Sequence, residues 1–205
     1  MTFPRVQFMF DFGSPNAYLC HKVIAAIEAR TGVTLEYVPV LLGGLFKLAN
    51  NRSPAESQAD IPNKRAYEQL EMKRFIATHQ LVKFRFNPFF PVNTLKIMRG
   101  AIAAQNLGCF APYVDAVYAA MWEQGRNMDD VAVIVEVLSA AGMDVNRLLD
   151  RSQHPDVKNA LLANTQSAFK RGAFGSPTFF AGNEMFFGKD RLLDVEQEIL
   201  RSMSA

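Results

Sequence analysis

The sequence predicts an α/β protein in which the two ends of the chain form a four-stranded sheet and a large all-helical insertion lies between them. Strand-like patterns occur twice near each end, and helix-like periodicity fills the middle. Because two strands alone make a marginal sheet, the two ends are expected to join. The order of elements is then β-α-β, a helical block and β-β-α. A cleft is expected where the block meets the sheet, and such junctions often bind ligands.

The N-terminal unit opens with a strand at residues 5–11. Val6, Phe8 and Phe10 alternate onto one side of it. Met9 places a further apolar side chain on the other side, which is typical of a strand covered on both faces.

A helix and a second strand complete this unit. Residues 15–30 carry apolar side chains at helical spacing, and Gly32 is a typical helix stop. Residues 35–38 then predict the second strand.

The middle of the chain predicts roughly five to seven helices, separated by proline and glycine breaks. The breaks fall at residues 88–91, Gly108, Gly125 and Gly142. The apolar positions that carry the pattern are Leu70, Phe75, Ile76 and Ala77; Leu95, Met98 and Ile102; Val114, Val117 and Met121; Val131, Ile134 and Leu138; and Val157, Leu161 and Ala168.

The C-terminal unit predicts a hairpin followed by a helix. Strand-like residues 178–181 and 184–187 flank Gly182-Asn183, a typical two-residue turn. Asp190 is placed to cap a final helix. The apolar face of that helix consists of Leu192, Val195 and Ile199.

Composition narrows the class of protein. The chain has 205 residues, 49% of them hydrophobic, and a net charge of +2 without a basic run, which disfavours a nucleic-acid partner. No apolar stretch approaches the ~20 residues of a membrane span, and the N-terminus lacks a signal-peptide pattern, so we expect a cytoplasmic protein. Cys20 and Cys109 are expected to be buried, reduced thiols, and no metal site is expected.

Ser14, directly before Pro15, has two interpretations. Serine is a preferred N-cap and proline is tolerated at the first helical position, so both residues are explained as a helix start. The same helix end also favours an anion, and the Ser14 hydroxyl could donate a hydrogen bond to a bound thiolate. A nucleophilic serine is disfavoured, because no GxSxG motif is present and no histidine is spaced to serve Ser14.

Other segments carry candidate ligand residues, each with a purely structural alternative. Phe89 and Phe90, between two prolines, are placed to stack on an aromatic substrate, or they belong to the core, and Trp122 has the same two interpretations. Lys47 and the pair at residues 63–64 are placed to bind a carboxylate, or they are simply solvated.

Taken together, these segments resemble the 2-hydroxychromene-2-carboxylate isomerase family, which is grouped with kappa-class glutathione transferases in the thioredoxin-like superfamily. The resemblance covers essentially the whole chain. It rests on FDFGSPNAYL, PNKRAY, PVNTLKIMRG, MWEQGRN and FGSPTFFAGNEMFFGKDRL. It implies a thioredoxin-like domain formed by residues 1–41 and 173–205, a helical insertion at 42–172, and a homodimer.

The resemblance also implies roles for individual residues. Ser14 matches the serine that binds the sulfur of glutathione, and Ser176 matches a position whose backbone binds the cysteinyl part of glutathione. Pro177 matches the cis-proline of the fold, although local sequence alone favours an ordinary trans bond. The turn that would hold the γ-glutamyl end is Phe187, Gly188, Lys189 and Asp190. The substrate-side positions are Lys47, Asn63, Lys64, Val92 and Asn93, and Val92 stands where the family pattern has a tyrosine.

The residues themselves disfavour disulfide chemistry. Ser14-Pro15-Asn16-Ala17 stands where oxidoreductases of this superfamily have a cysteine pair, and thiol–disulfide exchange needs an attacking thiolate. The resemblance implies instead that glutathione supplies the sulfur to isomerise 2-hydroxychromene-2-carboxylate and trans-o-hydroxybenzylidenepyruvate in aromatic-compound catabolism. A kappa-like glutathione transferase and a non-catalytic thioredoxin-like binding protein are the alternatives.

Overall fold

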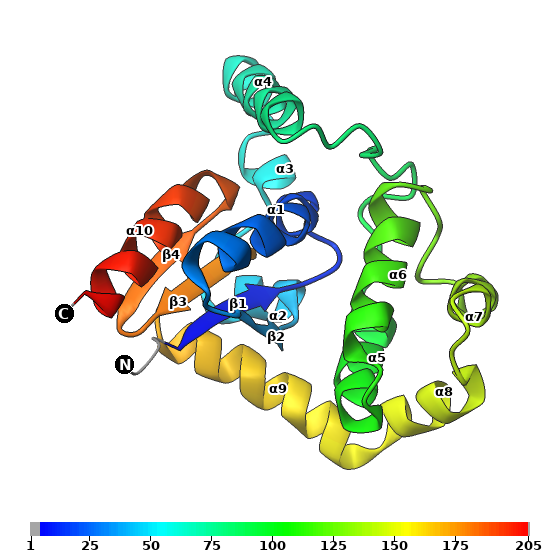
Figure 1. The fold of residues 1–205 in the computed structure, drawn as a ribbon. Coiled ribbons are helices and arrows are strands. Elements are labelled where there is room, and N and C mark those ends of the chain that lie inside the picture. The colour runs from blue at the N-terminus through cyan, green and yellow to red at the C-terminus, as the bar shows by residue number, and fades with distance from the viewer. Residues whose placement is uncertain (1–4, 205) are drawn as a thin grey trace.

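The computed structural model describes residues 5–204, which form one sheet and a set of helices around it (Figure 1). The elements, in chain order, are β1 (Val6–Phe10), α1 (Pro15–Thr31), β2 (Glu36–Pro39), α2 (Leu42–Leu48), α3 (Pro54–Ser57), α4 (Pro62–Thr78), α5 (Leu95–Leu107), α6 (Phe110–Trp122), α7 (Val131–Ala140), α8 (Val145–Gln153), α9 (Pro155–Lys170), β3 (Thr178–Ala181), β4 (Glu184–Phe187), a 3-10 turn (Lys189–Arg191) and α10 (Leu192–Met203).

Both ends of the chain contribute to one four-stranded sheet, as the sequence predicted. The strand order is β2-β1-β3-β4. β1 pairs with β2 in parallel and with β3 antiparallel, and the β3–β4 hairpin closes with Ala181 opposite Glu184. The expected two-residue turn is therefore confirmed, with Gly182 in the left-handed region at φ 58°.

The sheet is covered on both faces, which explains why every residue of β1 is buried. Phe8 and Phe10 face the large core, which they share with α1, α5, α6 and α10. Met9 faces a smaller core formed with α2 and α9, which includes Leu45 and Ala168. The apolar residue on each side of β1 thus has a helix layer to pack against (Figure 1).

Helix α1 begins and ends where its sequence signals predict. Ser14 is the N-cap, and its hydroxyl accepts a hydrogen bond from the Ala17 N–H. Pro15 occupies the first turn, and Gly32 ends the helix in the left-handed conformation at φ 71°.

The helical block departs from the prediction in number and detail. Among the described residues it holds eight helices, α2 to α9, rather than five to seven. The short α2 and α3 were not individually predicted, because segments of this length carry too few apolar repeats. The nine-residue α8 was not predicted either, although Val145, Leu148 and Leu149 have helical spacing after the N-cap Asp144. The second strand is Glu36–Pro39, one residue later than expected.

The block has no separate core, because its buried apolar residues belong to the large and the small core, both of which also contain residues of the sheet. For example, Phe10 of β1 packs against Tyr118 of α6, with ring centroids 6.0 Å apart. The division into residues 1–41 with 173–205 and residues 42–172 stays a prediction. Helix α4 is less deeply packed. None of its described side chains is fully buried and it stands away from the sheet (Figure 1), although Met72, Phe75 and Ile76 are partly buried against the large core.

Two exclusions apply to the described part of the chain, residues 5–204. None of its helices is long and apolar enough to cross a membrane. It contains no group of three or more histidine, cysteine, aspartate or glutamate residues placed to hold a metal ion. Cys20 and Cys109 are free; Cys20 is buried as expected, whereas Cys109, at the start of α6, is only partly buried.

Candidate active site

Ser14 lies at the junction of β1 and α1, where the sheet and the helical block meet. Its side chain is 4% exposed. The hydroxyl donates to the carbonyl oxygen of Ser176 at 2.9 Å and accepts from the Ala17 N–H at 3.2 Å. The Ser14 hydroxyl oxygen therefore caps α1 and also connects it to Ser176, a residue far away in the sequence.

The first turn of α1 leaves one backbone donor without a partner among the described residues. Pro15 has no N–H, the Ala17 N–H is taken by Ser14, and the Tyr18 N–H bonds to the Ser14 carbonyl. The Asn16 N–H remains, at the positive end of a 17-residue helix. An anion placed beside Ser14 therefore has the Asn16 amide available, and it gains the Ser14 hydroxyl as a donor when the hydroxyl hydrogen turns away from the Ser176 carbonyl.

Ser176 and Pro177 lie against this helix start. The Ser176–Pro177 peptide bond is cis, as the resemblance implied and contrary to the local expectation. The Ser176 hydroxyl accepts from the Asp11 N–H at 3.1 Å and lies 3.4 Å from the Met9 carbonyl, to which it donates. Hydrogen bonds of the Ser176 side chain thus connect β1 to the segment before β3, in addition to the backbone hydrogen bonds between β1 and β3.

Asp11 is the buried carboxyl that the sequence reasoning missed. It accepts from the Gly13 N–H at 2.8 Å and from the Leu42 N–H at 2.7 Å, and the Thr94 side chain also bonds to it. Burial raises the pKa of Asp11, while these three hydrogen bonds act in the opposite direction. Asp11 thereby connects the Ser14 turn to the starts of α2 and α5.

The only sequence signal for Asp11 was an acidic residue directly after an apolar strand. That position brings a charge to the edge of the sheet, beside the helix start. Gly13 belongs to the same arrangement, because a Cβ on it would lie only 3.1 Å from the Thr94 methyl group. The turn before Ser14 is therefore closely packed on the segment leading into α5.

Trp122 lies inside the protein, so the core interpretation is the observed one. Its ring has 0% exposure, and its indole N–H donates to the Phe12 carbonyl at 2.8 Å. This bond holds the backbone two residues before Ser14. Trp122 also contacts Phe86 and Phe90, with centroids 5.9 and 6.1 Å away. Trp122 therefore packs against the aromatic loop from the core side, and its ring is not accessible to a substrate.

The loop in front of Trp122 is more open. Phe89 is 53% exposed, Phe90 and Val92 are half-buried, and Asn93 is exposed. Asn87 shapes the loop: its amide donates to the carbonyls of Met121 and Arg126, and its oxygen accepts from the Phe89 N–H.

The C-terminal turn is attached to the cis-proline segment. The Gly188 N–H donates to the Pro177 carbonyl at 3.0 Å, and Gly188 itself has φ 93°, which favours glycine. Phe187 is exposed and its ring packs on Phe174 at 4.3 Å. Of the implied site residues, the structure thus brings together Ser14, Ser176, Pro177 and this turn.

The expected capping role of Asp190 is wrong. A 3-10 turn begins at Lys189, and neither it nor α10 has a side-chain cap. The Asp190 carboxylate instead pairs with the Lys189 ammonium, which is buried and lies 5.3 Å from the centre of the Phe75 ring of α4. Lys189 therefore faces α4, while Asp190 remains largely exposed.

The remaining basic candidates lie on exposed surface. Lys47 is exposed near the end of α2, next to Phe46, whose ring lies 3.8 Å from where a Cβ on Gly175 would be. This contact puts α2 beside the segment before Ser176. Asn63 and Lys64 are exposed in the first turn of α4, a helix that stands away from the sheet (Figure 1).

Two known proteins are similar in sequence to this chain over nearly its whole length. The 2-hydroxychromene-2-carboxylate isomerase of Sphingobium xenophagum is 26% identical over 195 residues, which cover 95% of this chain and 97% of that protein. Human glutathione S-transferase kappa 1 is 26% identical over 211 residues, covering 92% and 88% of the two chains.

A solved structure and a family model add to these relatives. A crystallised 2-hydroxychromene-2-carboxylate isomerase superposes with a TM-score of 0.82 at 26% identity, covering 97% of this chain and 95% of the other. The model of the DSBA-like thioredoxin domain matches residues 5–200, nearly the whole chain. The chain therefore belongs to the DSBA-like thioredoxin domain family, with a serine at the helix start.

Proposed function

We propose that this protein is a glutathione-dependent isomerase that interconverts 2-hydroxychromene-2-carboxylate and trans-o-hydroxybenzylidenepyruvate, or a related aromatic carboxylate. One observation carries the proposal: the buried Ser14 hydroxyl and the Asn16 N–H, which has no partner among the described residues, both lie at the start of α1, where the first turn contains no cysteine. Relatives named as isomerases and glutathione transferases support the same kind of chemistry.

The helix start has the donors that a bound thiolate needs. Lowering a thiol pKa from about 8.5 by about two units takes ~2.7 kcal/mol of preference for the thiolate. A helix N-terminus contributes about 0.3–1 kcal/mol, or ~2 when partly buried, and one charge-assisted hydrogen bond about 1.5–3. The Ser14 hydrogen must turn from the Ser176 carbonyl towards the sulfur, so part of its contribution is offset. The Asn16 N–H carries no such cost.

Bound glutathione would supply a thiolate that adds to a conjugated carbon of the substrate, so that the former double bond can rotate before the sulfur leaves. The chain's own residues have to hold the sulfur and the substrate in place. Ser14 and the Asn16 N–H hold the sulfur, and the backbone of Ser176 and the turn at 187–190 hold the peptide ends. During addition, negative charge moves towards the conjugated keto oxygen, where a cation is needed.

Lys47, Asn63 and Lys64 are the candidates for the carboxylate and keto oxygens. All three side chains are exposed, and Phe46, next to Lys47, lies against Gly175 and so places α2 beside the segment before Ser176. Phe89 and Phe90 present the aromatic surface on which the substrate ring packs, with Trp122 as support. Asp190, exposed beside the cis-proline segment, is the acceptor for the amino group of the γ-glutamyl end.

An ultraviolet difference titration with glutathione, reading thiolate absorbance against pH, tests the thiolate step. We expect a saturable signal with a pKa well below that of free glutathione. Ser167→Ala, an exposed serine on α9, is a matched control that should leave the signal unchanged. Absence of any signal at saturating glutathione would refute the proposal and favour a binding protein without thiolate chemistry.

A kappa-like transferase is the second candidate, since human glutathione S-transferase kappa 1 is as similar as the isomerases. It shares the thiolate but releases a stable conjugate. Mass spectrometry after incubation with an electrophile and glutathione separates the two: isomerisation with glutathione regenerated supports the isomerase, and accumulating conjugate supports the transferase. The homodimer and the cytoplasmic location remain predictions, the former open to light scattering.

A further inference from the structure

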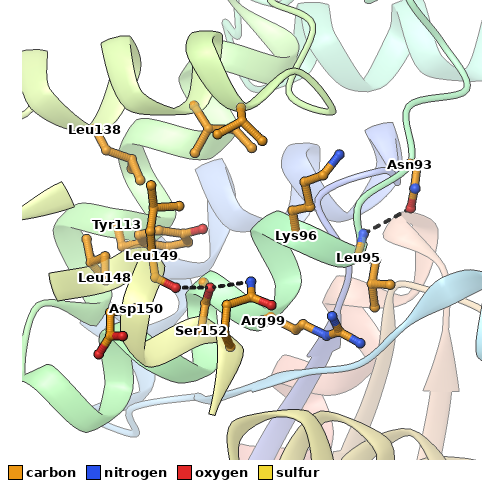
Figure 2. A pocket seen from close by; sticks show the side chains of 14 residues that line it. Asn93, Leu95, Lys96, Arg99, Tyr113, Leu138, Leu148, Leu149, Asp150 and Ser152 are labelled. Atoms are coloured by element: carbon orange, nitrogen blue, oxygen red, sulfur yellow. Dashed lines mark hydrogen bonds between the residues drawn. The ribbon is translucent and has the colours of Figure 1, made fainter. Parts of the chain in front are cut away.

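A pocket lies in the helical block, between α5, α7 and α8 (Figure 2). Its volume is about 530 Å³, within the range typical of small-molecule sites. None of Ser14, Ser176, Pro177 or the turn at 187–190 lines it. Asn93 lines one end of the pocket, and the next residue, Thr94, packs on Gly13 in the turn before Ser14.

The walls of the pocket are mainly apolar. Among the residues that line it, Leu138 and Leu148 are buried and Leu149 is half-buried. Val131, at the first position of α7, is 47% exposed and forms part of the rim. Such walls leave apolar surface in contact with water, which burial by an apolar ligand would remove.

The floor is built by a close contact between two helices. The Tyr113 hydroxyl of α6 donates to the Ile97 carbonyl of α5 at 2.9 Å. A Cβ on Gly100 would overlap that hydroxyl, so glycine is what allows the ring of Tyr113 to lie there. Ser152 closes the neighbouring side, with its hydroxyl bonded to the Leu149 carbonyl (Figure 2).

The charged groups around the pocket leave one cation available. The Lys96 ammonium is held by the Asp129 carboxylate at 2.6 Å, and Asp150 lies 3.4 Å from His154. Arg99 lies at the edge of the pocket on the side of Leu95, and within residues 5–204 its guanidinium has no hydrogen-bond or ion-pair partner (Figure 2).

From this arrangement we infer that the pocket binds a small monocarboxylate with a ring-sized apolar body. The apolar body lies against Leu138, Leu148 and Leu149, and the carboxylate pairs with Arg99, whose planar fork matches two carboxylate oxygens. A neutral apolar molecule leaves the guanidinium unused, and a cation is repelled by it. The site is separate from the one proposed at Ser14 and does not depend on the function proposed there.

Isothermal titration with 2-naphthoate tests the site, with 2-naphthalenemethanol as the uncharged analogue. We expect saturable binding of the acid and at least about tenfold weaker binding of the alcohol. Arg99→Gln should weaken 2-naphthoate to the level of the alcohol. Arg147→Gln, an exposed arginine on α8 outside the pocket, is the matched control and should change nothing.

A second pair of variants tests the location. Val131→Trp places a large ring over the rim and should abolish binding, whereas Ala132→Trp, on the next exposed residue of α7, should not. Neither change touches the core, and thermal unfolding would verify that both variants fold. Binding should also persist in the presence of saturating glutathione and in Ser14→Ala.

Three results would overturn the inference. One is the absence of 2-naphthoate binding to the unaltered protein. Another is binding that is equally strong in Arg99→Gln and Val131→Trp. The third is binding that glutathione displaces or Ser14→Ala removes, which would place the acid at the α1 start instead.

Discussion

The Ser14 hydroxyl donates a hydrogen bond of 2.9 Å to the carbonyl oxygen of Ser176, across 162 residues of sequence. This bond joins the start of α1 to the segment before β3, and the pairing of β1 with β3 brings the two together. The same hydroxyl caps α1. Ser14 therefore has a structural role that exists whether or not a ligand is bound, and its chemical role has to be measured separately.

Replacing Ser14 separates these two roles. Ser14→Ala should lower the free energy of unfolding by roughly 0.5–2 kcal/mol through loss of the cap. It should also raise the pKa of the bound glutathione thiol and lower turnover, because one donor to the sulfur is lost. Urea unfolding and the thiolate titration measure the two effects.

Ser53→Ala is the matched control for this change. Ser53 caps the exposed helix α3 in the same way, through a bond from the Glu56 N–H. Ser53→Ala should lower the free energy of unfolding through loss of this cap, without any change in the thiolate titration. An unchanged thiol pKa and turnover in Ser14→Ala would leave Ser14 with the capping role alone.

The buried Asp11 carboxyl should make stability depend on pH. Burial raises the folded pKa of Asp11 above its ordinary value, so the folded protein still holds the proton at a pH where the unfolded chain has lost it. The Asp11 contribution is therefore fully present below the unfolded pKa and is lost as pH rises through the folded pKa. Asp11→Asn should remove this decline.

Urea unfolding of both proteins between about pH 4 and pH 7 measures that difference. The free energy of unfolding of Asp11→Asn, relative to the unaltered protein, should rise across this range. The amide also loses one acceptor for the Gly13 or Leu42 N–H, which costs stability at every pH. A difference that is constant with pH would contradict the raised pKa.

Asp115 should show the opposite dependence. A hydrogen bond from His21, at 3.0 Å, lowers the pKa of this carboxyl, so its contribution is present above the unfolded pKa and is lost as pH falls through the folded pKa. Because the Asp115 side chain is 69% exposed, Asp115→Asn should cost only a few tenths of a kcal/mol. An equal loss of unfolding free energy in Asp115→Asn at pH 3 and at pH 7 would show that the contact with His21 is not the cause.

Gly100→Ala should destabilise the helical block. The new methyl group would overlap the Tyr113 hydroxyl, so α5 and α6 must shift, at a cost of roughly 1–3 kcal/mol. The double variant with Tyr113→Phe should recover part of that loss, because the hydroxyl is the nearest atom. Full additivity of the two changes in urea unfolding would contradict the predicted contact.

Gly43→Ala provides the control for this helix substitution. Gly43 lies in α2, and no atom comes within 4 Å of the position its Cβ would take. Alanine is the better helix former by about 1 kcal/mol, so this variant should be neutral or more stable. The opposite signs of the two changes would show that the surroundings, and not helix propensity, decide the effect at Gly100.

The sequence predicted those elements whose signals are local and strong. Alternation in β1, the Gly182-Asn183 turn and the Ser14-Pro15 helix start each depend on a few adjacent residues, and the structure confirms all three. Helix α8 was missed although Asp144 and the spacing of Val145, Leu148 and Leu149 are a helix signal, because that signal spans only nine residues between two longer helices. Asp190 was placed as a cap because a 3-10 turn before α10 has no distinct sequence signal.

By itself the sequence determined the order of the four strands, the start of α1, and the lack of a cysteine pair there, since all three follow from residue types and short spacings. Only the tertiary structure decided which groups meet. It placed Ser176 against Ser14, buried Trp122 beneath the aromatic loop, and put Asp11 between the starts of α2 and α5. Burial and hydrogen bonding between segments far apart in the chain depend on how the layers pack, and local patterns contain no information about that packing.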